Sequence, residues 1–334
     1  MFIVESYSLA VIFCFVTMLC WGSWANTQKL VQDEWRFELF YWDYVLGILL
    51  FSLIAAFTLG SLGENGRAFL ADLSQANAEN LRSAFIGGIV FNLANILLTA
   101  AIASAGMSVA FPIGIGIALV LGVLINYFLV NKGDPTLLFM GVALIVVAIV
   151  LNALAYRKAS KTINRASLKW ILVSIIAGIL MSLFYPFIAV SMDLENFVTP
   201  AAGKMTPYTA FVIFALGIVA SNLLFNSIMM RRPLEGSPLS YADYFRGRPG
   251  VHLVGLMGGA IWALGNLFNL IAAGKAGPAI SYGLGQGATL VAALWGVVVW
   301  KEFEHAPRGV MPLITSMFIL FVLGLGLIIY SGGS

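Results

Sequence analysis

Asparagine pairs recur at one spacing in two apolar stretches of the chain. Asn92 and Asn95 stand three residues apart in the first stretch, and Asn266 and Asn269 repeat that spacing in the second. Residues three apart share one face of an α-helix, so each pair presents its amides in one direction. A polar side chain inside a bilayer is costly unless a partner, a cavity or a bound solute meets it. Amides suit ureide, lactam or sugar hydroxyl groups, because they donate and accept at once; hydrogen bonding between helices is their alternative use.

Aromatic and other polar side chains stand close to these asparagines. Trp262 lies four residues before Asn266, which predicts that both share a helix face. Gln286 lies four residues after Tyr282 and is expected to share a face with it in the same way. A flat heterocycle or a sugar ring gains by packing on an indole while amides bind its edge. The predicted substrate-binding residues are Asn92, Asn95, Trp262, Asn266, Asn269, Tyr282, Gln286, Trp21, Trp24 and Tyr185.

Two of these predictions have an alternative that the sequence leaves open. Trp21 and Trp24 fall close to the end of the first apolar segment, where a belt of interfacial tryptophans is common. The run SYGLGQG at 281–287 also fits ordinary packing of small residues between helices.

Two carboxylates are the candidates for proton coupling, which needs a titrating group on the transport pathway. Glu5 begins the first apolar segment, and Asp43 lies a few residues inside the second. A helix end in contact with water or headgroups is the alternative role for each. His252 and His305 stand near segment ends without metal-ligand company, and no Ser-His-Asp, CxxC or HExxH spacing occurs. The sequence therefore predicts no metal site and no enzyme.

Prolines and glycines inside the apolar segments are candidates for bending them. A proline within a helix frees a backbone carbonyl and kinks the helix, and glycines let backbones approach closely. The predicted hinge or gating residues are Pro112, Gly114, Gly116, Pro186, Gly285 and Gly287. Kinks also occur in helices that have no mechanical role.

The elements that must position these residues are membrane-spanning helices. Hydrophobic residues make up 60% of the chain and charged residues only 10%, against about 25% in a soluble domain. A helix needs about 20 apolar residues to cross the hydrocarbon core. Ten segments meet this requirement: 5–26, 40–60, 83–104, 107–130, 136–155, 169–191, 206–230, 251–273, 278–300 and 309–331.

The chain contains an internal repeat. Residues 87–131 and 258–302 match at a constant offset of 171, aligning Gly87, Gly88, Leu93, Asn95, Ala101, Gly106, Gly114 and Gly116 with Gly258, Gly259, Leu264, Asn266, Ala272, Gly277, Gly285 and Gly287. Five segments precede the polar loop near residue 160 and five follow it, so the halves insert with opposite orientation. We therefore predict an all-α integral membrane protein of ten transmembrane helices in a 5+5 inverted repeat, with repeats at 1–156 and 169–334 and a linker at 157–168.

Charge sets the expected orientation. Loops after the odd-numbered segments hold 13 Lys and Arg residues, and the opposite face holds 5. By the positive-inside rule the 157–168 loop is cytoplasmic and both termini face outward, in the cell (inner) membrane. The net charge of +3 is too small to indicate nucleic-acid binding.

Several motifs resemble those of ureide permeases, a family of the drug/metabolite transporter superfamily. In chain order they are VES (4–6), WGSW (21–24), YWDY (41–44), AFTLGSLG (56–63), DLSQAN (72–77), GGIVFNLAN (87–95) and INYFL (125–129). The second half matches through GNLFNLIAAGKAG (265–277) and SYGLGQG (281–287), which are also similar to the related glucose, ribose and rhamnose porters. WGSW replaces the Gly-Thr-Trp run of plant-type permeases. The central loop here is also shorter and lacks their Walker-A-like segment.

The resemblance implies a drug/metabolite transporter fold and a secondary transporter. Its expected activity is proton-coupled import of ureides such as allantoin, other purine degradation products or nucleobases, by alternating access and without a cofactor. A monosaccharide porter is the alternative. A drug or metabolite exporter is less favoured, because the repeated mid-span positions hold amides and not carboxylates. Coupling to sodium stays open, as does a monomeric or homodimeric state. The expected partners are a small polar metabolite and the lipid bilayer.

Overall fold

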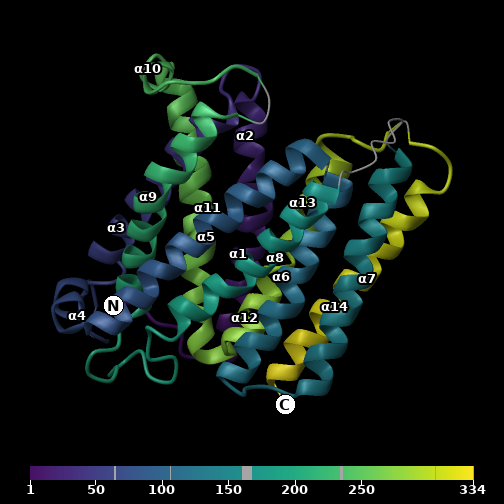
Figure 1. Ribbon diagram of the computed structural model, residues 1–334. Coiled ribbons are helices and arrows are strands. Elements are labelled where there is room, and N and C mark those ends of the chain that lie inside the picture. The colour runs from purple at the N-terminus through teal and green to yellow at the C-terminus, as the bar shows by residue number, and fades with distance from the viewer. Residues whose placement is uncertain (64, 106, 160–167, 234–235, 305, 334) are drawn as a thin grey trace.

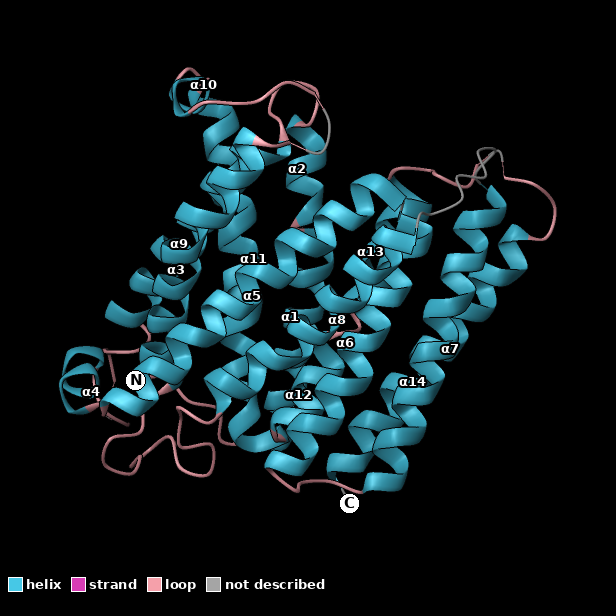
Figure 2. Cartoon of the chain, viewed as in Figure 1, coloured by secondary structure: helices cyan, strands magenta, loops and turns pink. Residues whose placement is uncertain are grey.

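In the described part of the chain, helices joined by loops form the regular secondary structure, apart from one isolated β-bridge between Met192 and Met205 (Figures 1 and 2). A computed structural model describes residues 1–63, 65–105, 107–159, 168–233, 236–304 and 306–333. Three features singled out in the sequence lie outside this description: most of the central loop, His305 and the side chain of Pro112.

Among the described residues, nine long helices form the body of the bundle. They are α1 (Tyr7–Ser23), α3 (Phe37–Phe57), α5 (Ala78–Ala105), α6 (Met107–Leu129), α7 (Pro135–Ala159), α8 (Leu168–Ala189), α9 (Pro207–Arg231), α11 (Pro249–Ala276) and α14 (Val310–Gly333). Short helices connect or extend them: α2 (Ala25–Val31), α4 (Phe69–Gln75), α10 (Tyr241–Phe245), α12 (Pro278–Gly285), α13 (Ala288–Leu294) and the π-helix η1 (Trp295–Val299).

Within the described residues, nine helical segments are long and apolar enough to cross a membrane. They include α1 with α2 as one segment, Tyr7–Val31, and α12 through η1 as another, Pro278–Val299. A further apolar helix, Ile113–Leu129 of α6, is shorter. The chain is therefore a multi-pass membrane protein, as predicted. The first segment extends beyond the predicted residue 26 because α2 continues almost in line after Ser23.

The helices begin where the sequence supplies capping groups. The side chain of Ser6 accepts from the backbone N–H of Leu9 at the start of α1. Thr206 accepts in the same way from Thr209 at the start of α9, where Pro207 occupies the first turn. A proline is tolerated there because the first N–H groups of a helix have no partner within it.

Glycines let α5 and α9 touch backbone to backbone. A Cβ atom at Gly88 of α5 would lie 2.0 Å from the carbonyl oxygen of Phe214 in α9. A Cβ atom at Gly217 of α9 would lie 2.1 Å from the carbonyl oxygen of Phe85 in α5. Both distances are far below van der Waals contact, so only glycine allows this crossing.

The crossing of α3 and α11 has the same construction. A Cβ atom at Gly259 of α11 would lie 2.0 Å from the carbonyl oxygen of Tyr44, and one at Gly47 of α3 would lie 2.2 Å from that of Leu256. At the two crossings the helix backbones therefore touch directly, which a side chain at any of these glycine positions would prevent.

Both chain ends lie at the same end of the bundle in Figure 1, together with α4, and α10 and α2 lie at the opposite end. We call these the terminal end and the α10 end. The helix pair α7 and α14 stands at one side of the bundle (Figure 2). Since the helices run between these two ends, side chains at successive depths can be placed along the bundle axis.

One membrane-crossing segment is interrupted at mid-depth. Helix α12 stops at Gly285, and Gln286 and Gly287 form a turn with ψ angles of −12° and −9° before α13 begins. The segment ends in the π-helix η1. By contrast, α8 continues as one helix through Pro186, a predicted bend position. The interruption at Gly285–Gly287 begins and ends at two of the predicted hinge residues.

Candidate functional site

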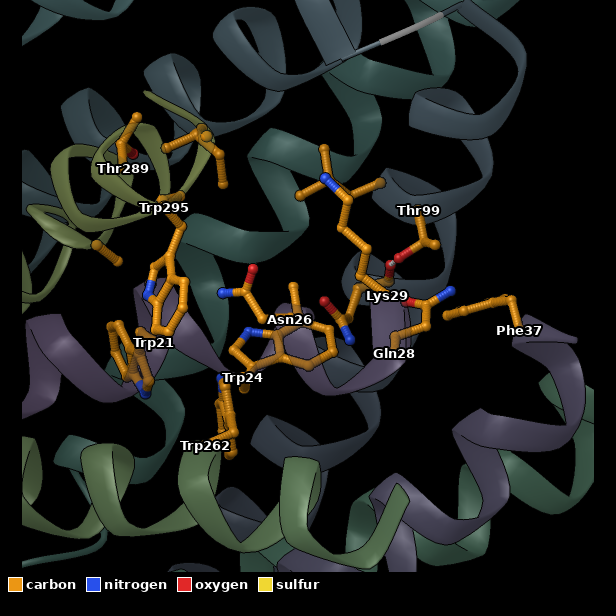
Figure 3. A pocket seen from close by; sticks show the side chains of 18 of the residues that line it. Trp21, Trp24, Asn26, Gln28, Lys29, Phe37, Thr99, Trp262, Thr289 and Trp295 are labelled. Carbon is orange, nitrogen blue, oxygen red and sulfur yellow. Dashed lines mark hydrogen bonds between the residues drawn. The ribbon is translucent and has the colours of Figure 1, made fainter. Parts of the chain in front are cut away.

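A cavity of about 730 Å³ opens into the bundle from the α10 end. Its lining comes from α1, α2, α3, α5, α6, α7, α8, α9, α11, α13 and η1, and Figure 3 shows part of it. At the mouth, which we define as Lys29, Gln32, Trp300 and Glu302, Gln32 and Glu302 are exposed. The deepest lining residues are buried. The volume is in the range of cavities that bind small molecules.

Four aromatic side chains form the floor of the cavity: Trp21, Phe91, Phe184 and Trp262. The rings of Trp21 and Trp262 are stacked, with centroids 6.0 Å apart and planes inclined by 10°. Phe91 lies 4.5 Å from Trp262 and 5.2 Å from Phe184, measured between ring centroids. Above them Trp24 packs on Tyr44 with centroids 4.5 Å apart. Stacked and tilted rings of this kind provide flat apolar surface for a flat ligand.

Polar groups line the cavity walls. Asn95 of α5 and Asn152 of α7 contribute amides, and Gln286 projects from the interruption between α12 and α13. Asn152 Oδ1 is buried and accepts no hydrogen bond from the described residues. An unpaired buried acceptor of this kind gains from a donor on a bound molecule.

A hydrogen-bonded chain stands behind Asn95. Its Nδ2 donates to the Tyr41 hydroxyl at 3.1 Å, and Tyr41 donates to Asn92 Oδ1 at 2.9 Å. Asn92 Nδ2 donates to Ser221 Oγ at 3.0 Å. The amide of Asn95 is therefore fixed by its neighbours before any ligand arrives.

The charged side chains at the mouth are paired with each other. Lys29 Nζ lies 2.8 Å from Glu302 Oε1 and 4.2 Å from the centroid of the Trp300 ring. Tyr156 donates to the other oxygen of Glu302 at 2.8 Å. Arg36 and Glu38, which also line the cavity, pair with each other at 2.6 Å. Such pairs leave little net charge at the entrance.

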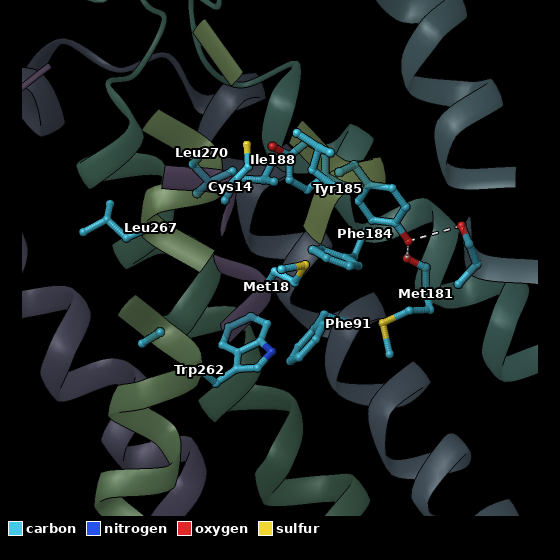
Figure 4. Close-up of a cluster of buried hydrophobic side chains, with 14 of the residues drawn as sticks. Cys14, Met18, Phe91, Met181, Phe184, Tyr185, Ile188, Trp262, Leu267 and Leu270 are labelled. Atoms are coloured by element: carbon cyan, nitrogen blue, oxygen red, sulfur yellow. Dashed lines mark hydrogen bonds between the residues drawn. The ribbon is translucent and has the colours of Figure 1, made fainter. Parts of the chain in front are cut away.

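An apolar plug closes the bundle between the floor and the terminal end. We define it as Cys14, Met18, Ile188, Leu267 and Leu270, all buried (Figure 4). Eight residues separate Trp262 of the floor from Leu270, which along α11 is about 12 Å at 1.5 Å per residue. Beside the plug Tyr185 lies within hydrogen-bond distance of Ser281 Oγ, at 3.0 Å. The cavity is therefore open at one end only.

The structure places half of the predicted substrate-binding residues at the cavity. Trp21, Trp24, Asn95, Trp262 and Gln286 line it. The other five are buried and do not line it: Asn92, Asn266, Asn269, Tyr282 and Tyr185. Trp21 and Trp24, for which an interfacial belt was the alternative expectation, both line the cavity.

Local geometry explains why the second set points elsewhere. Asn269 donates to the backbone of Ser281 at 2.7 Å, and Tyr282 donates to the backbone of Ala118 at 3.2 Å. Gln286 keeps the helical backbone hydrogen bond to the carbonyl oxygen of Tyr282, at 3.1 Å, but of the two side chains only that of Gln286 lines the cavity. Asn266 is fully buried, and neither amide atom has a partner among the described residues.

The two predicted proton-coupling carboxylates differ in burial. Glu5 is exposed just before α1. Asp43 is 1% exposed and accepts from Trp35 Nε1 at 3.0 Å and from the Tyr244 hydroxyl at 2.5 Å; His252 Nδ1 lies 2.8 Å from it. The position of His252 near the end of a predicted segment gave no indication of this carboxylate partner. Burial and the hydrogen bond to Asp43 raise the pKa of Tyr244 well above its ordinary value, which keeps this hydroxyl a donor.

The predicted hinge glycines have different surroundings. A Cβ atom at Gly285 would lie 2.8 Å from the Trp21 ring, and one at Gly287 would lie 2.5 Å from Met18 Sδ. At Gly114 it would lie 2.6 Å from a Leu98 methyl carbon, whereas at Gly116 it would meet nothing within 4 Å. Close packing therefore requires three of the four glycines.

Sequence reasoning missed several lining residues. Asn152 is a polar residue inside a predicted span, so the principle that identified Asn95 could have found it. Gln28, Thr99, Thr289 and Trp295 also line the cavity. Thr289 and Trp295 lie beyond the interruption of their segment, which no local pattern in the sequence marks.

Comparison with known proteins gives the family. The sequence model of the ureide permease family matches residues 40–169 and 151–331. The chain belongs to the ureide permease family. Ureide permease 1 of Arabidopsis thaliana is 25% identical over 394 residues, which cover 100% of this chain and 99% of the relative. Ureide permease 2 of the same plant is 26% identical, with the same coverage of both chains.

A further relative agrees with this assignment, and a solved structure shares the fold alone. Probable ureide permease A3 of Vigna unguiculata is 31% identical over 173 residues, 50% of this chain and 46% of the relative. A solved crystal structure of another protein shares the fold, with a TM-score of 0.61 and 14% identity over 97% of this chain and 96% of its own. Ureide permeases are transporters and not enzymes, in agreement with the sequence-based prediction.

Proposed function

We propose that this protein is a secondary transporter that carries a neutral, flat ureide or a related nitrogen heterocycle through the cavity by alternating access. Its membership of the ureide permease family carries the proposal, since its relatives are named for permeation of ureides. The cavity supports the same cargo chemistry. Its aromatic floor offers flat apolar surface, its walls offer amides, and the charges at its mouth are paired.

The repeat supports alternating access by two structurally related halves. An offset of 170–171 residues converts the contact of Gly88 with Phe214 into that of Gly259 with Tyr44, because Gly88 aligns with Gly259 and Tyr44 aligns with Phe214. The other two glycine contacts are related in the same way. The short helices α4 and α10 correspond too, because Asp72 and Asp243 stand 171 residues apart, and these helices lie at opposite ends of the bundle. An inverted repeat with α6 as the tenth span accounts for all of these pairs.

The direction of the open cavity follows from charge. Lys and Arg predominate in the loops at the α10 end, so this end is cytoplasmic and the cavity faces inward. Both termini then face outward, in the cell membrane. A carrier that imports its cargo releases it from this state.

Proton coupling is assigned to the cluster of Asp43, His252, Trp35 and Tyr244. The contact between buried Asp43 and half-buried His252 joins α3 to α11, two helices whose residues line the cavity. Glu5, exposed to solvent, has no such connection. Protonation of Asp43 would remove the attraction to His252 and change how the two helices pack.

The first test is thermal stabilisation of the purified protein by allantoin, uracil, xanthine, glucose, ribose and rhamnose. A ligand that binds the folded state raises its apparent stability. We expect a shift with allantoin or a nucleobase and none with sugars, followed by accumulation of the same compound in proteoliposomes under a pH gradient. A shift with a sugar alone would overturn the proposed cargo in favour of a monosaccharide. The variant Trp262→Ala serves as a control, since it should lose the shift while staying folded.

A further inference from the structure

Four buried polar side chains form a chain that ends at the cavity wall. We call Asn95, Tyr41, Asn92 and Ser221 the relay. The donor–acceptor distances along it are 3.1 Å, 2.9 Å and 3.0 Å, and all four residues are buried. Of the four, Asn95 alone lines the cavity.

The far end of the relay sets its direction. Ser221 Oγ lies 2.8 Å from the carbonyl oxygen of Gly217 and 3.0 Å from that of Ile218. A carbonyl oxygen only accepts and a hydroxyl has one proton, so the Ser221 proton is directed at these carbonyls and its oxygen accepts from Asn92. Asn92 thus uses its NH₂ group for Ser221 and offers its oxygen to Tyr41.

The same reasoning continues to the cavity. Tyr41 gives its one proton to Asn92 and therefore accepts from the NH₂ group of Asn95. The oxygen of Asn95 remains, and it accepts no hydrogen bond from the described residues. An amide that could turn over freely would present donor and acceptor alike, whereas this amide is held in one orientation.

We propose that the relay makes Asn95 Oδ1 a dedicated acceptor for an N–H group of the cargo, with Tyr41 and Ser221 as positioning residues. This inference rests on the proposed function, because it assumes that the cargo is a ring bearing N–H groups. Ureides and nucleobases carry such groups, and methylation of the nitrogen removes the donor while leaving the ring flat.

Binding of methylated hydantoins tests the proposal. Hydantoin is a ureide ring with two N–H groups. 5-Methylhydantoin keeps both, and 1-methyl- and 3-methylhydantoin, isomers of the same size, each lose one. We expect at least one N-methyl isomer to bind the wild-type protein about tenfold more weakly than the C-methyl isomer, the effect of one hydrogen bond. Equal affinities for all three isomers would overturn the proposal.

The variants Tyr41→Phe and Ser221→Ala test the positioning role. Each should bring the ratio between N-methyl and C-methyl affinities towards one, because Asn95 is then free to turn over. The matched control is Tyr44→Phe. Tyr44 lies on the same helix as Tyr41, and its buried hydroxyl has no partner among the described residues. Trp262→Ala should weaken all isomers and leave the ratio intact. An unchanged ratio in both relay variants would overturn the role of the relay.

A ligand-free measurement separates the relay from the proposed function. In a double-mutant cycle on thermal unfolding, Tyr41→Phe and Ser221→Ala should be coupled, since either change breaks the same chain. Additive effects would overturn the relay whatever the protein binds. Failure of every hydantoin to bind would count against the proposed cargo. It would not count against the relay, because the unfolding cycle is measured without any ligand.

Discussion

Two asparagines related by the repeat show two different surroundings of a polar side chain in this protein: one lines the cavity, and the other is buried without a partner. Asn95 and Asn266 are equivalent in the repeat, yet Asn95 lines the cavity and is fixed by Tyr41, whereas Asn266 is fully buried and neither of its amide atoms has a partner among the described residues. Leaving a buried polar atom unpaired costs about 1–3 kcal/mol. The two asparagines should therefore respond oppositely to removal of their amides.

We predict that Asn266→Leu raises the melting temperature and leaves cargo affinity within about twofold, because the change removes two unpaired buried atoms. Asn95→Leu should lower affinity by about tenfold or more, since it removes a cavity acceptor and the partner of Tyr41. Thermal unfolding and equilibrium binding in detergent measure both effects. A loss of affinity in Asn266→Leu equal to that in Asn95→Leu would place the cargo deeper than the described floor.

A second prediction at this scale concerns proton coupling. Asp43→Asn should still exchange cargo across a proteoliposome membrane and should fail to accumulate it under a pH gradient, because the variant cannot bind and release the proton. Glu5→Gln is the matched control, since it neutralises an exposed carboxylate and should accumulate cargo normally. Accumulation by both variants would remove the Asp43 cluster from the coupling mechanism.

At the scale of the helix, the interruption between α12 and α13 decides how the cavity is shaped. It ends α12 beside the Trp21 ring and lets Gln286 project into the cavity, while Tyr282 turns towards α6 and α8. Gly285 is the residue that permits this contact, because a Cβ atom there would lie 2.8 Å from Trp21.

We predict that Gly285→Ala displaces Trp21 into the cavity and lowers cargo affinity by about tenfold, with a modest loss of thermal stability from overpacking. Gly116→Ala should leave affinity and stability unchanged or slightly improved, because a Cβ atom there meets nothing within 4 Å and alanine favours the helix. The two variants are compared by isothermal binding. Equal behaviour would show that Trp21 is not confined by Gly285.

Much of the fold at this scale could be predicted from sequence, and part of the site could not. Apolar length located the membrane-crossing helices of the described residues, and the repeat aligned Gly88 with Gly259, which the structure places at two helix crossings. Helical spacing could not show that Gln286 lines the cavity while Tyr282 does not, because it contains no information on the interruption that follows Gly285. Nor could it show the partner of His252, because Asp43 lies 209 residues away in the chain and is brought to it only by packing of α3 on α11.

At the scale of the whole molecule, the cavity is open at the α10 end and closed at the terminal end by the floor and the plug. This arrangement is one of the two states that alternating access requires. The proposed orientation makes the open end cytoplasmic. Labelling the cavity with a reagent added from one known side of the membrane tests the open state and the orientation together.

We predict that Thr99→Cys, in a background lacking Cys14 and Cys20, reacts with an impermeant maleimide added from the cytoplasmic side of membrane vesicles and is protected by cargo. Leu270→Cys, in the plug, should stay unreactive from that side. Reaction of Thr99→Cys only in vesicles of the opposite orientation would reverse the topology. Labelling that is indifferent to cargo would place the cargo outside this cavity.

The plug also bears on the energy economy of the cell. Below the cavity floor about 12 Å of closely packed, buried side chains lies before the opposite end of the bundle, and a hydrated ion that entered it would have to shed its water. A resting carrier of this shape is therefore electrically tight. It can remain in the membrane in high copy number without dissipating the gradients on which the other transporters of the same membrane depend.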